Sequence, residues 1–221
     1  MTPDRAAGLQ SAVGIAPGTF PERLAATGPD ARALYRALLP PFAATANPPP
    51  VADFADRAGL APDRARAALA DLAAADLVAL GPDGDIIGAF PLSAAETRHR
   101  VQVDGGPVLH AMCAVDALGV PAMLGKAALV TSADPATGQQ IEVRVEADGG
   151  VVADPPDAVV LLARVGDGPL ASACCSVIDF HADRAAADRV LGTDGARGAV
   201  LTVPEAHALG VLLFRGLPAR R

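Results

Sequence analysis

Apolar residues recur at helical spacing near the start of the chain. The segment DARALYRALLPPF places Leu34, Leu38 and Leu39 on one stripe, a spacing typical of an amphipathic helix. Because residues that precede a proline avoid the helical conformation, we expect this helix to end at Pro40 and Pro41.

The next segment, residues 51–90, predicts two more helices and a hairpin. Gly59 ends the first helix, and Pro62 opens the second at a first-turn position that tolerates proline. In LVALGPDGDIIGAF, two apolar runs flank a GPDG turn, which is the pattern of a β-hairpin. Three helices followed by a hairpin indicate a winged-helix-like domain.

After Pro91 the pattern changes to strands alternating with helices. Residues 98–103 predict a strand that ends at a DGG turn, and LHAMCAVDALG predicts a helix limited by Pro121. The other expected elements are strands at 127–131, 141–146 and 158–164, a strand in CCSVIDF, a helix in DRAAADRVLG, a strand in GAVLTV and a final helix that opens at Pro204. This order predicts an α+β fold with a mostly antiparallel sheet.

We therefore expect three parts along the chain. Residues 1–28, rich in Gly, Pro and Ala, predict a loose or partly helical N-terminal extension. Residues 29–91 form the winged-helix-like domain, and residues 92–221 form the α+β domain that carries all three cysteines.

Composition and charge reduce the number of functional classes that the chain could belong to. The chain has 221 residues, of which 51% are hydrophobic, enough for a sizeable core. A formal net charge of −7 argues against a nucleic-acid partner, which normally requires a basic face. No run of about 18 apolar residues predicts a membrane span. The N-terminus lacks a basic stretch followed by an apolar one, so we expect no signal peptide and a cytoplasmic location.

The three cysteines are Cys113, Cys174 and Cys175. An odd number in a cytosolic chain argues against a disulfide framework. Adjacent cysteines rarely bridge each other, because the bond strains the peptide between them. No C-x-x-C pair or His/Cys cluster indicates structural zinc. The thiols are therefore either buried apolar residues or reactive groups.

Cys113 and Asp116 lie three positions apart, and such positions share a face of a helix. The carboxylate alone disfavours a thiolate, a conflict that a soft cation bound to both groups would remove. A second thiol is then needed, and Cys174 and Cys175 are the candidates. Spacing alone favours a simpler interpretation, in which Cys113 is a core residue and Asp116 a surface residue, because C-x-x-D is a weak pattern.

Four segments together change this interpretation: FPLSAAETRHRV, GGPVLHAMCAVDALGVPAMLGKAALVTSADPATGQQIEV, ASACCSVIDFHADRAAADRVL and VLTVPEAHALG. They resemble the alkylmercury (organomercurial) lyase family over roughly residues 88–215. The combination of Cys-x-x-Asp, Pro-Ala-x-Leu-Gly, Ala-Thr-Gly and a Cys-Cys pair is specific. The winged-helix-like pattern also fits the N-terminal domain of that family.

The resemblance implies protonolysis of a carbon–mercury bond to a hydrocarbon and Hg(II), an activity of mercury resistance and detoxification that requires no cofactor. Matched by motif, Cys113 is the first thiol, Asp116 the proton carrier and Cys174 the second thiol, and Cys175 is an accessory neighbour. Cys113, Cys174 and Asp116 would contact mercury transiently. The implied partners are the organomercurial substrate, low-molecular-weight thiols as co-reactants and mercuric reductase as acceptor of the bound Hg(II).

The chain departs from the family pattern near the first thiol. His110 and Met112 stand where several members have aromatic residues, a difference that bears on substrate range. Asp134 stands near the place of a further cysteine in some relatives, one regarded as structural. We assign no role to the remaining histidines, His99, His181 and His207.

Three other interpretations stay open at this level. In the first, the chain is a mercury- or metal-responsive winged-helix transcription regulator. In the second, it is a diverged family member that binds metal without turnover. In the third, it is an α+β domain with buried, slowly reacting cysteines. The acidic balance and a helix that carries Arg64 and Arg66 beside Asp63, Asp71 and Asp76 weigh against DNA binding.

Overall fold

The computed structural model describes residues 1–192 and 197–217. Its helices are α1 (Pro3–Ala12), α2 (Phe20–Ala26), α3 (Pro29–Thr45), α4 (Val51–Arg57), α5 (Pro62–Ala74), α6 (Ala114–Leu124), α7 (Leu170–Ala173), α8 (Arg184–Leu191) and α9 (Val203–Phe214). Its strands are β1 (Val78–Leu80), β2 (Ile86–Ala89), β3 (Leu92–Ser93), β4 (Arg100–Val103), β5 (Val108–Ala111), β6 (Ala128–Ala133), β7 (Gln140–Val145), β8 (Val151–Asp154), β9 (Val159–Arg164), β10 (Asp179–His181) and β11 (Arg197–Thr202).

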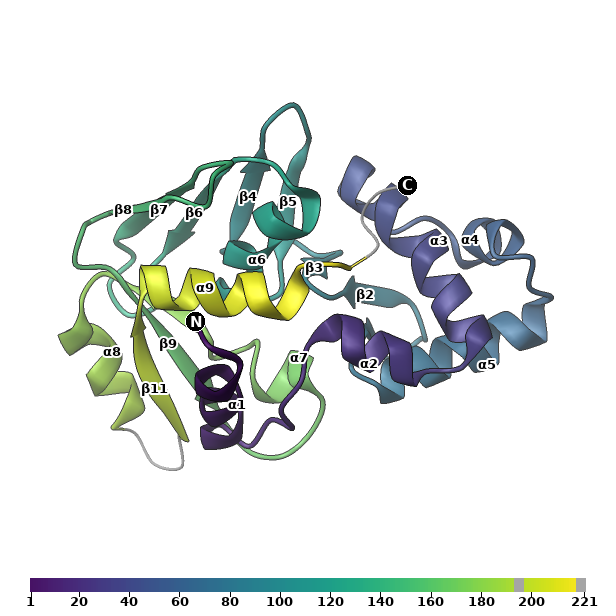
Figure 1. The fold of residues 1–221 in the computed structure, drawn as a ribbon, viewed down its shortest axis with the longest axis horizontal. Coiled ribbons are helices and arrows are strands. Elements are labelled where there is room, and N and C mark those ends of the chain that lie inside the picture. Colours follow the sequence, from purple (N-terminus) through teal and green to yellow (C-terminus); the bar gives the residue numbers. More distant parts are fainter. Residues whose placement is uncertain (193–196, 218–221) are drawn as a thin grey trace.

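The strands form two sheets, and every strand pair in the described residues is antiparallel. The larger sheet has the order β1-β2-β3-β5-β4-β6-β7-β8, and the smaller sheet has the order β10-β9-β11. Helices and strands are mixed along the chain (Figure 1). The expected α+β class with a mostly antiparallel sheet is therefore confirmed.

The burial of the strands follows their place in the sheets. In β7, apolar residues at 141, 143 and 145 are buried, and the polar residues between them are exposed, because successive side chains of a strand point to opposite faces. In β9, the central strand of the smaller sheet, residues 159–163 are all buried. One face of β7 thus covers the core, whereas β9 is covered on both faces.

Helices α6 and α9 form the centre of the molecule and contact strands of both sheets. In Figure 1 α9 crosses the middle of the molecule with α6 behind it. The helices approach closely at Gly119 and Gly210, where a Cβ on Gly210 would lie 2.7 Å from the carbonyl oxygen of Val115. Glycine is therefore required at this crossing, because any side chain would push the helices apart.

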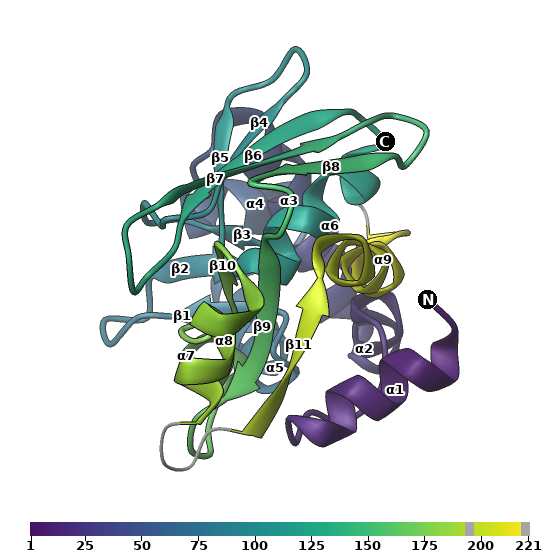
Figure 2. The ribbon, with the colours of Figure 1, turned by 90° about the vertical axis from the view of Figure 1, so that its left-hand side faces the viewer.

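The N-terminal helices lie against the part of the chain that carries the cysteines. Helix α1 contacts α9 and β11, and α2 contacts α9 and α3; Figure 2 shows α1 beside β11. Helices α3, α4 and α5 pack together, and the β1–β2 hairpin continues the larger sheet at its edge. The Tyr35 hydroxyl of α3 donates a hydrogen bond to the Phe90 carbonyl, at 2.7 Å. The division into three parts stays a prediction.

Two helices continue through prolines that we expected to end them. Helix α3 runs through Pro40 and Pro41, and Phe42 and Ala43 beyond them are buried. Helix α6 likewise runs through Pro121 to a left-handed residue, Gly125. A proline inside a helix removes a hydrogen bond, and burial of the apolar residues around these prolines offsets that loss.

Sequence patterns also misplaced one helix and missed three elements. The segment LHAMCAVDALG was expected to be wholly helical, but β5 occupies Val108–Ala111 and α6 begins only at Ala114. Strand β5 pairs with both β3 and β4. This pairing makes the segment a strand, whereas periodicity alone does not distinguish a strand from a helix in so short an apolar run. Strands β3 and β8 and the four-residue helix α7 were not expected.

Within residues 1–192 and 197–217, no helix has the length and apolar character needed to cross a membrane.

Candidate active site

Cys113 occupies the residue that caps the N-terminus of α6. Its backbone is extended, and its Sγ accepts a hydrogen bond from the backbone N–H of Asp116 at 3.4 Å. The first N–H groups of a helix have no hydrogen-bond partner within the helix, so the backbone N–H of Asp116 is available to bind the Cys113 sulfur. Cys113 is 2% exposed, and its thiol is held at the start of α6 by its own backbone.

Asp116 lies in the first turn of α6 and is buried, at 4% exposure. In the described part of the chain it forms no ion pair; its side-chain neighbours are the thiols of Cys113 and Cys175. Burial raises the pKa of Asp116 to about 7, and hydrogen bonds with the two thiols oppose the rise. A carboxyl group with this pKa gives and takes a proton readily near neutral pH.

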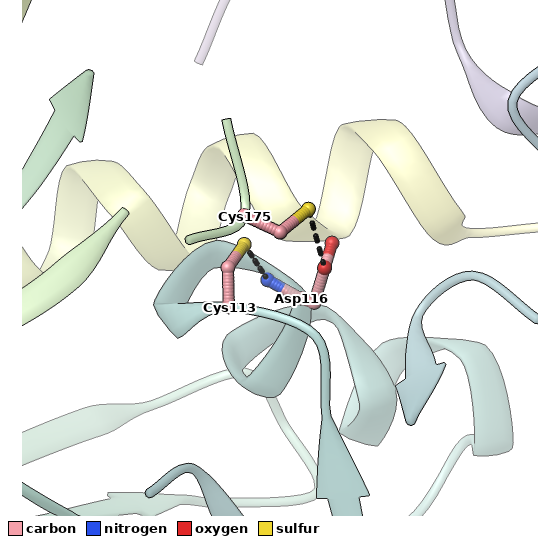
Figure 3. A group of neighbouring side chains, drawn as sticks. All are labelled: Cys113, Asp116 and Cys175. Atoms are coloured by element: carbon pink, nitrogen blue, oxygen red, sulfur yellow. Dashed lines mark hydrogen bonds between the residues drawn. The ribbon is translucent and has the colours of Figure 1, made fainter. Parts of the chain in front are cut away.

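Cys175 completes this group from the other side of the site. It lies in the turn after α7, and its thiol donates to Asp116 Oδ2 at 3.8 Å, as Figure 3 shows. A backbone hydrogen bond from Ala114 to the carbonyl of Ile178, 3.0 Å long, joins this turn to the start of α6. One potential ligand atom from each of Cys113, Asp116 and Cys175 lies within 4.8 Å of the others. We call these three residues the thiol–carboxylate cluster.

Cys174, the expected second thiol, lies outside this cluster. Its Sγ is 3.8 Å from Nη1 of Arg164, and the thiol that reaches Asp116 belongs to Cys175. The two side chains diverge because Cys174 is the last residue of the α7 turn, where the backbone leaves the helix. Cys174 still lines the same cavity, and which of the two thiols is functional stays a prediction.

The surroundings keep all three thiols protonated. Burial raises the pKa of Cys113 well above its ordinary value. A hydrogen bond with Cys113 lowers the pKa of Cys175, but burial and the Asp116 carboxylate outweigh it and raise the pKa to about 11. Burial also raises the pKa of Cys174, and the Arg164 guanidinium opposes this rise. Each thiol therefore has to lose a proton to a base or to an exchanging ligand before it binds a metal.

The three thiols and Asp116 line a cavity of about 50 Å³. The rest of its wall is mainly apolar and comes from α9, β9 and the N-terminal segment, with Val13, Ile15 and Phe20 from the latter. Val13, Ile15 and Phe20, which lie more than 90 positions from Cys113 in sequence, thus contribute to the wall of the site. The buried position of the thiols and Asp116 in a mainly apolar wall favours their neutral forms over charged ones.

A second group of buried polar residues escaped the sequence analysis, which gave His99 and His181 no role. His99 Nε2 lies 3.2 Å from Asp179 Oδ1, and its Nδ1 lies 3.1 Å from the Ser132 hydroxyl. His181 Nδ1 lies 3.7 Å from Asp134 Oδ2. These contacts join the residue before β4, the end of β6 and β10, which are far apart in sequence, so no spacing in the sequence signalled them. We call them the histidine–aspartate pairs.

Thiols prefer soft metal ions, and a carboxyl with a pKa near neutrality suits proton transfer. The thiol–carboxylate cluster therefore fits a class of protein: an enzyme whose buried, mainly apolar site could hold a soft metal compound and transfer a proton.

Comparison with known proteins gives the particular family. The alkylmercury lyase family model matches residues 92–215. The alkylmercury lyase of Staphylococcus epidermidis is 32% identical over 178 residues, which cover 80% of this chain and 79% of the relative. The Streptomyces lividans alkylmercury lyase is 34% identical over 192 residues and 83% of each chain.

The fold has a solved counterpart as well. The crystal structure of the mercury-bound form of MerB2 superposes with a TM-score of 0.73, at 20% identity, and covers 89% of this chain and 96% of that one. The chain belongs to the alkylmercury lyase family, and its function is the cleavage of carbon–mercury bonds.

Proposed function

We propose that the thiol–carboxylate cluster cleaves the carbon–mercury bond of alkyl and aryl mercury compounds by protonolysis. The observation that supports this most directly is a buried carboxyl group of raised pKa beside two buried, neutral thiols. This reaction needs two soft ligands and one proton carrier from the protein. The reaction equation contains one co-reactant besides the substrate, an external thiol.

Capture of the substrate comes first. The substrate arrives as a thiol adduct, R–Hg–SR′, and exchanges onto Cys113. The Cys113–mercury bond forms, the bond to the external sulfur breaks, and R′SH leaves with the proton of the Cys113 thiol. Cys113 suits this step because the cap of α6 holds its sulfur at the cavity wall.

Proton transfer follows. The Cys175 thiol gives its proton to the Asp116 carboxylate, to which it already donates, and the resulting thiolate binds mercury. The added ligand raises electron density on the mercury–carbon bond. Asp116 then delivers the proton to the carbon, so that R–H leaves and Hg(II) stays bound to two thiolates. Asp116 thus acts as a base and then as an acid.

Release of Hg(II) restores the site. Two external thiols take the metal as Hg(SR′)₂ and return one proton to each cysteine. Overall, R–Hg–SR′ and R′SH give R–H and Hg(SR′)₂. Low-molecular-weight thiols are therefore proposed as co-reactants, and mercuric reductase as an alternative acceptor of the metal.

The test is headspace detection of methane from methylmercury with excess thiol. Wild type is expected to release methane far above the thiol-only background, and Cys113→Ser and Asp116→Ala are expected to lose this activity. A wild-type rate equal to the background would overturn the proposal. It would also leave open the alternative of a family member that binds mercury without turnover.

The second thiol is decided by a matched pair of variants. The contact with Asp116 favours Cys175, whereas the resemblance implied Cys174. We expect Cys175→Ser to lose most of the activity and Cys174→Ser, which removes a neighbouring thiol of equal size, to keep more of it. The reverse result would return the role to Cys174.

We further propose that the winged-helix-like part, residues 29–91, supports the site and does not bind DNA. Two of its arginines are already engaged: Arg64 with Asp30 and Arg66 with Asp63. Phe90 of this part lines the cavity. Removal of residues 1–88 should reduce stability or turnover, and unchanged turnover would contradict this role. DNA binding altered by mercury would favour the regulator instead.

A further inference from the structure

The N-terminal segment forms one wall of the cavity, although it lies outside residues 92–215. Val13, Ile15 and Phe20 line the cavity together with the thiols. Val13 and Phe20 are buried, at 0% and 5% exposure. These side chains therefore stand where the organic group of a mercury compound has to fit when its metal lies on Cys113.

Phe20 is the bulkiest of the three and is firmly held. Its ring stacks on Phe90 and Phe214, with centroid distances of 5.2 and 4.6 Å. It occupies the first position of α2, directly after Thr19, which forms a reciprocal capping box with Glu22. Such a cap fixes the direction in which the chain enters the helix, so the ring has little freedom to move aside.

The N-terminal polar side chains at the cavity already have partners. Both amide atoms of Gln10 bind the backbone of Gly18, at 2.8 and 3.2 Å. Arg23 lies 5.6 Å from the centroid of the Phe20 ring and 3.8 Å from Asp76. This wall therefore offers apolar surface to the organic group of a mercury compound and limits the size of that group, but it offers no specific polar contact.

The size of the cavity sets that limit. Its volume is about 50 Å³, whereas an apolar cavity that takes up benzene has roughly 150 Å³. A methyl group fits the smaller space. A phenyl group needs the wall to move, and overfilling a packed apolar site is unfavourable.

From this geometry we infer that the chain prefers short alkylmercury compounds to arylmercury compounds, and that Phe20 is the residue that sets this preference. The inference rests on the proposed function, and it names the substrate class of the same site. The ring blocks the larger organic groups and leaves proton transfer between Cys175 and Asp116 unaffected.

The test measures kcat/KM for methylmercury and for phenylmercury, as methane and as benzene released. Phenylmercury and methylmercury differ in intrinsic reactivity, so the informative quantity is the change of their ratio between variant and wild type. For Phe20→Ala we expect the phenyl-to-methyl ratio to rise at least tenfold, since one methylene of misfit in an apolar pocket changes discrimination about 10- to 200-fold. The ratio is insensitive to a loss of folded protein, because both activities fall together.

Two more variants complete the design. Ile15→Ala trims the same wall from a half-buried position and should raise the ratio in the same direction. Phe54→Ala removes a fully buried ring of α4 that does not line the cavity and should leave the ratio within twofold of wild type. An unchanged ratio in both Phe20→Ala and Ile15→Ala would overturn the inference, as would an equal rise in Phe54→Ala. Failure of the proposed function looks different, because neither hydrocarbon would then be released.

Discussion

Buried carboxylates occur in two settings within residues 92–215. Asp116 lies among thiols and apolar side chains, and burial raises its pKa to about 7. Burial also acts on Asp134, but backbone N–H groups of Ala182, Ala136 and Thr137 hold the pKa of that carboxyl below its ordinary value. The same side chain thus suits proton transfer where its charge is uncompensated and acts as a structural anchor where hydrogen bonds compensate it.

The largest effect expected from this contrast is on turnover. Asp116→Asn keeps the shape of the side chain but cannot carry a proton, so kcat for methane release should fall by about 10²- to 10⁴-fold. Asp134→Asn is the matched control, and its turnover per folded molecule should stay within a few-fold of wild type. Equal losses in the two variants would remove the distinction between the two carboxylates.

The second prediction concerns stability, for which Asp134 rather than Asp116 is expected to be the more important carboxylate. Asp134→Ala leaves the backbone N–H groups of Ala136, Thr137 and Ala182 without their acceptor and removes the charge that lies 3.7 Å from the buried His181 ring. The free energy of unfolding should fall by about 3 kcal/mol, the cost of leaving buried polar groups unpaired. Urea denaturation followed by circular dichroism measures this, and a fall below about 1 kcal/mol would mean that the anchor contributes little.

A third prediction separates activity from stability by pH. The pKa of Asp116 is raised in the folded protein, so the folded state binds the proton more tightly than the unfolded state. The stability linked to this group is complete below its unfolded pKa and is lost as pH rises towards 7. Wild type should therefore lose about 2 to 3 kcal/mol between pH 5 and pH 8 relative to Asp116→Asn.

Over the same range kcat/KM should rise, because the proposed reaction begins with Asp116 ionised. Stability and activity are thus expected to change in opposite directions with pH. Parallel changes, or a pH dependence of stability that persists in Asp116→Asn, would contradict the assignment.

The smallest effect is expected at the other histidine–aspartate pair. Asp179 contacts His99 and the partly exposed Arg98, and asparagine at this position still offers an oxygen. Asp179→Asn should lower the free energy of unfolding by about 1 kcal/mol. A thermal melt at matched pH measures it, and a large loss of turnover with an unchanged melt would instead give Asp179 a role in positioning the turn of Cys175.

Much of the fold followed from local pattern. Helices α5, α8 and α9 and strands β6, β7, β9 and β11 lie close to where periodicity and turn residues predicted them. The errors share a cause. Pro40, Pro41 and Pro121 stay inside helices, and Val108–Ala111 forms a strand, because packing and strand pairing outweighed local preference.

For the site, spacing alone favoured a core Cys113 and a surface Asp116, and only the family motifs pointed to the two residues as reactive groups. Cys113 and Asp116 are three residues apart, and the start of α6 brings them together through its own backbone. The family motifs also pointed to the Cys174–Cys175 pair as the source of a second thiol, because a motif records residue types in order.

Only the tertiary structure shows which of these thiols reaches Asp116, because adjacent side chains diverge where the backbone leaves α7. It alone gives Asp116 its pKa, which arises from burial by distant residues. It alone brings Phe20 to the cavity and pairs His99 with Asp179. Contacts of this kind depend on segments far apart in sequence, and they are decided by how the helices and sheets pack.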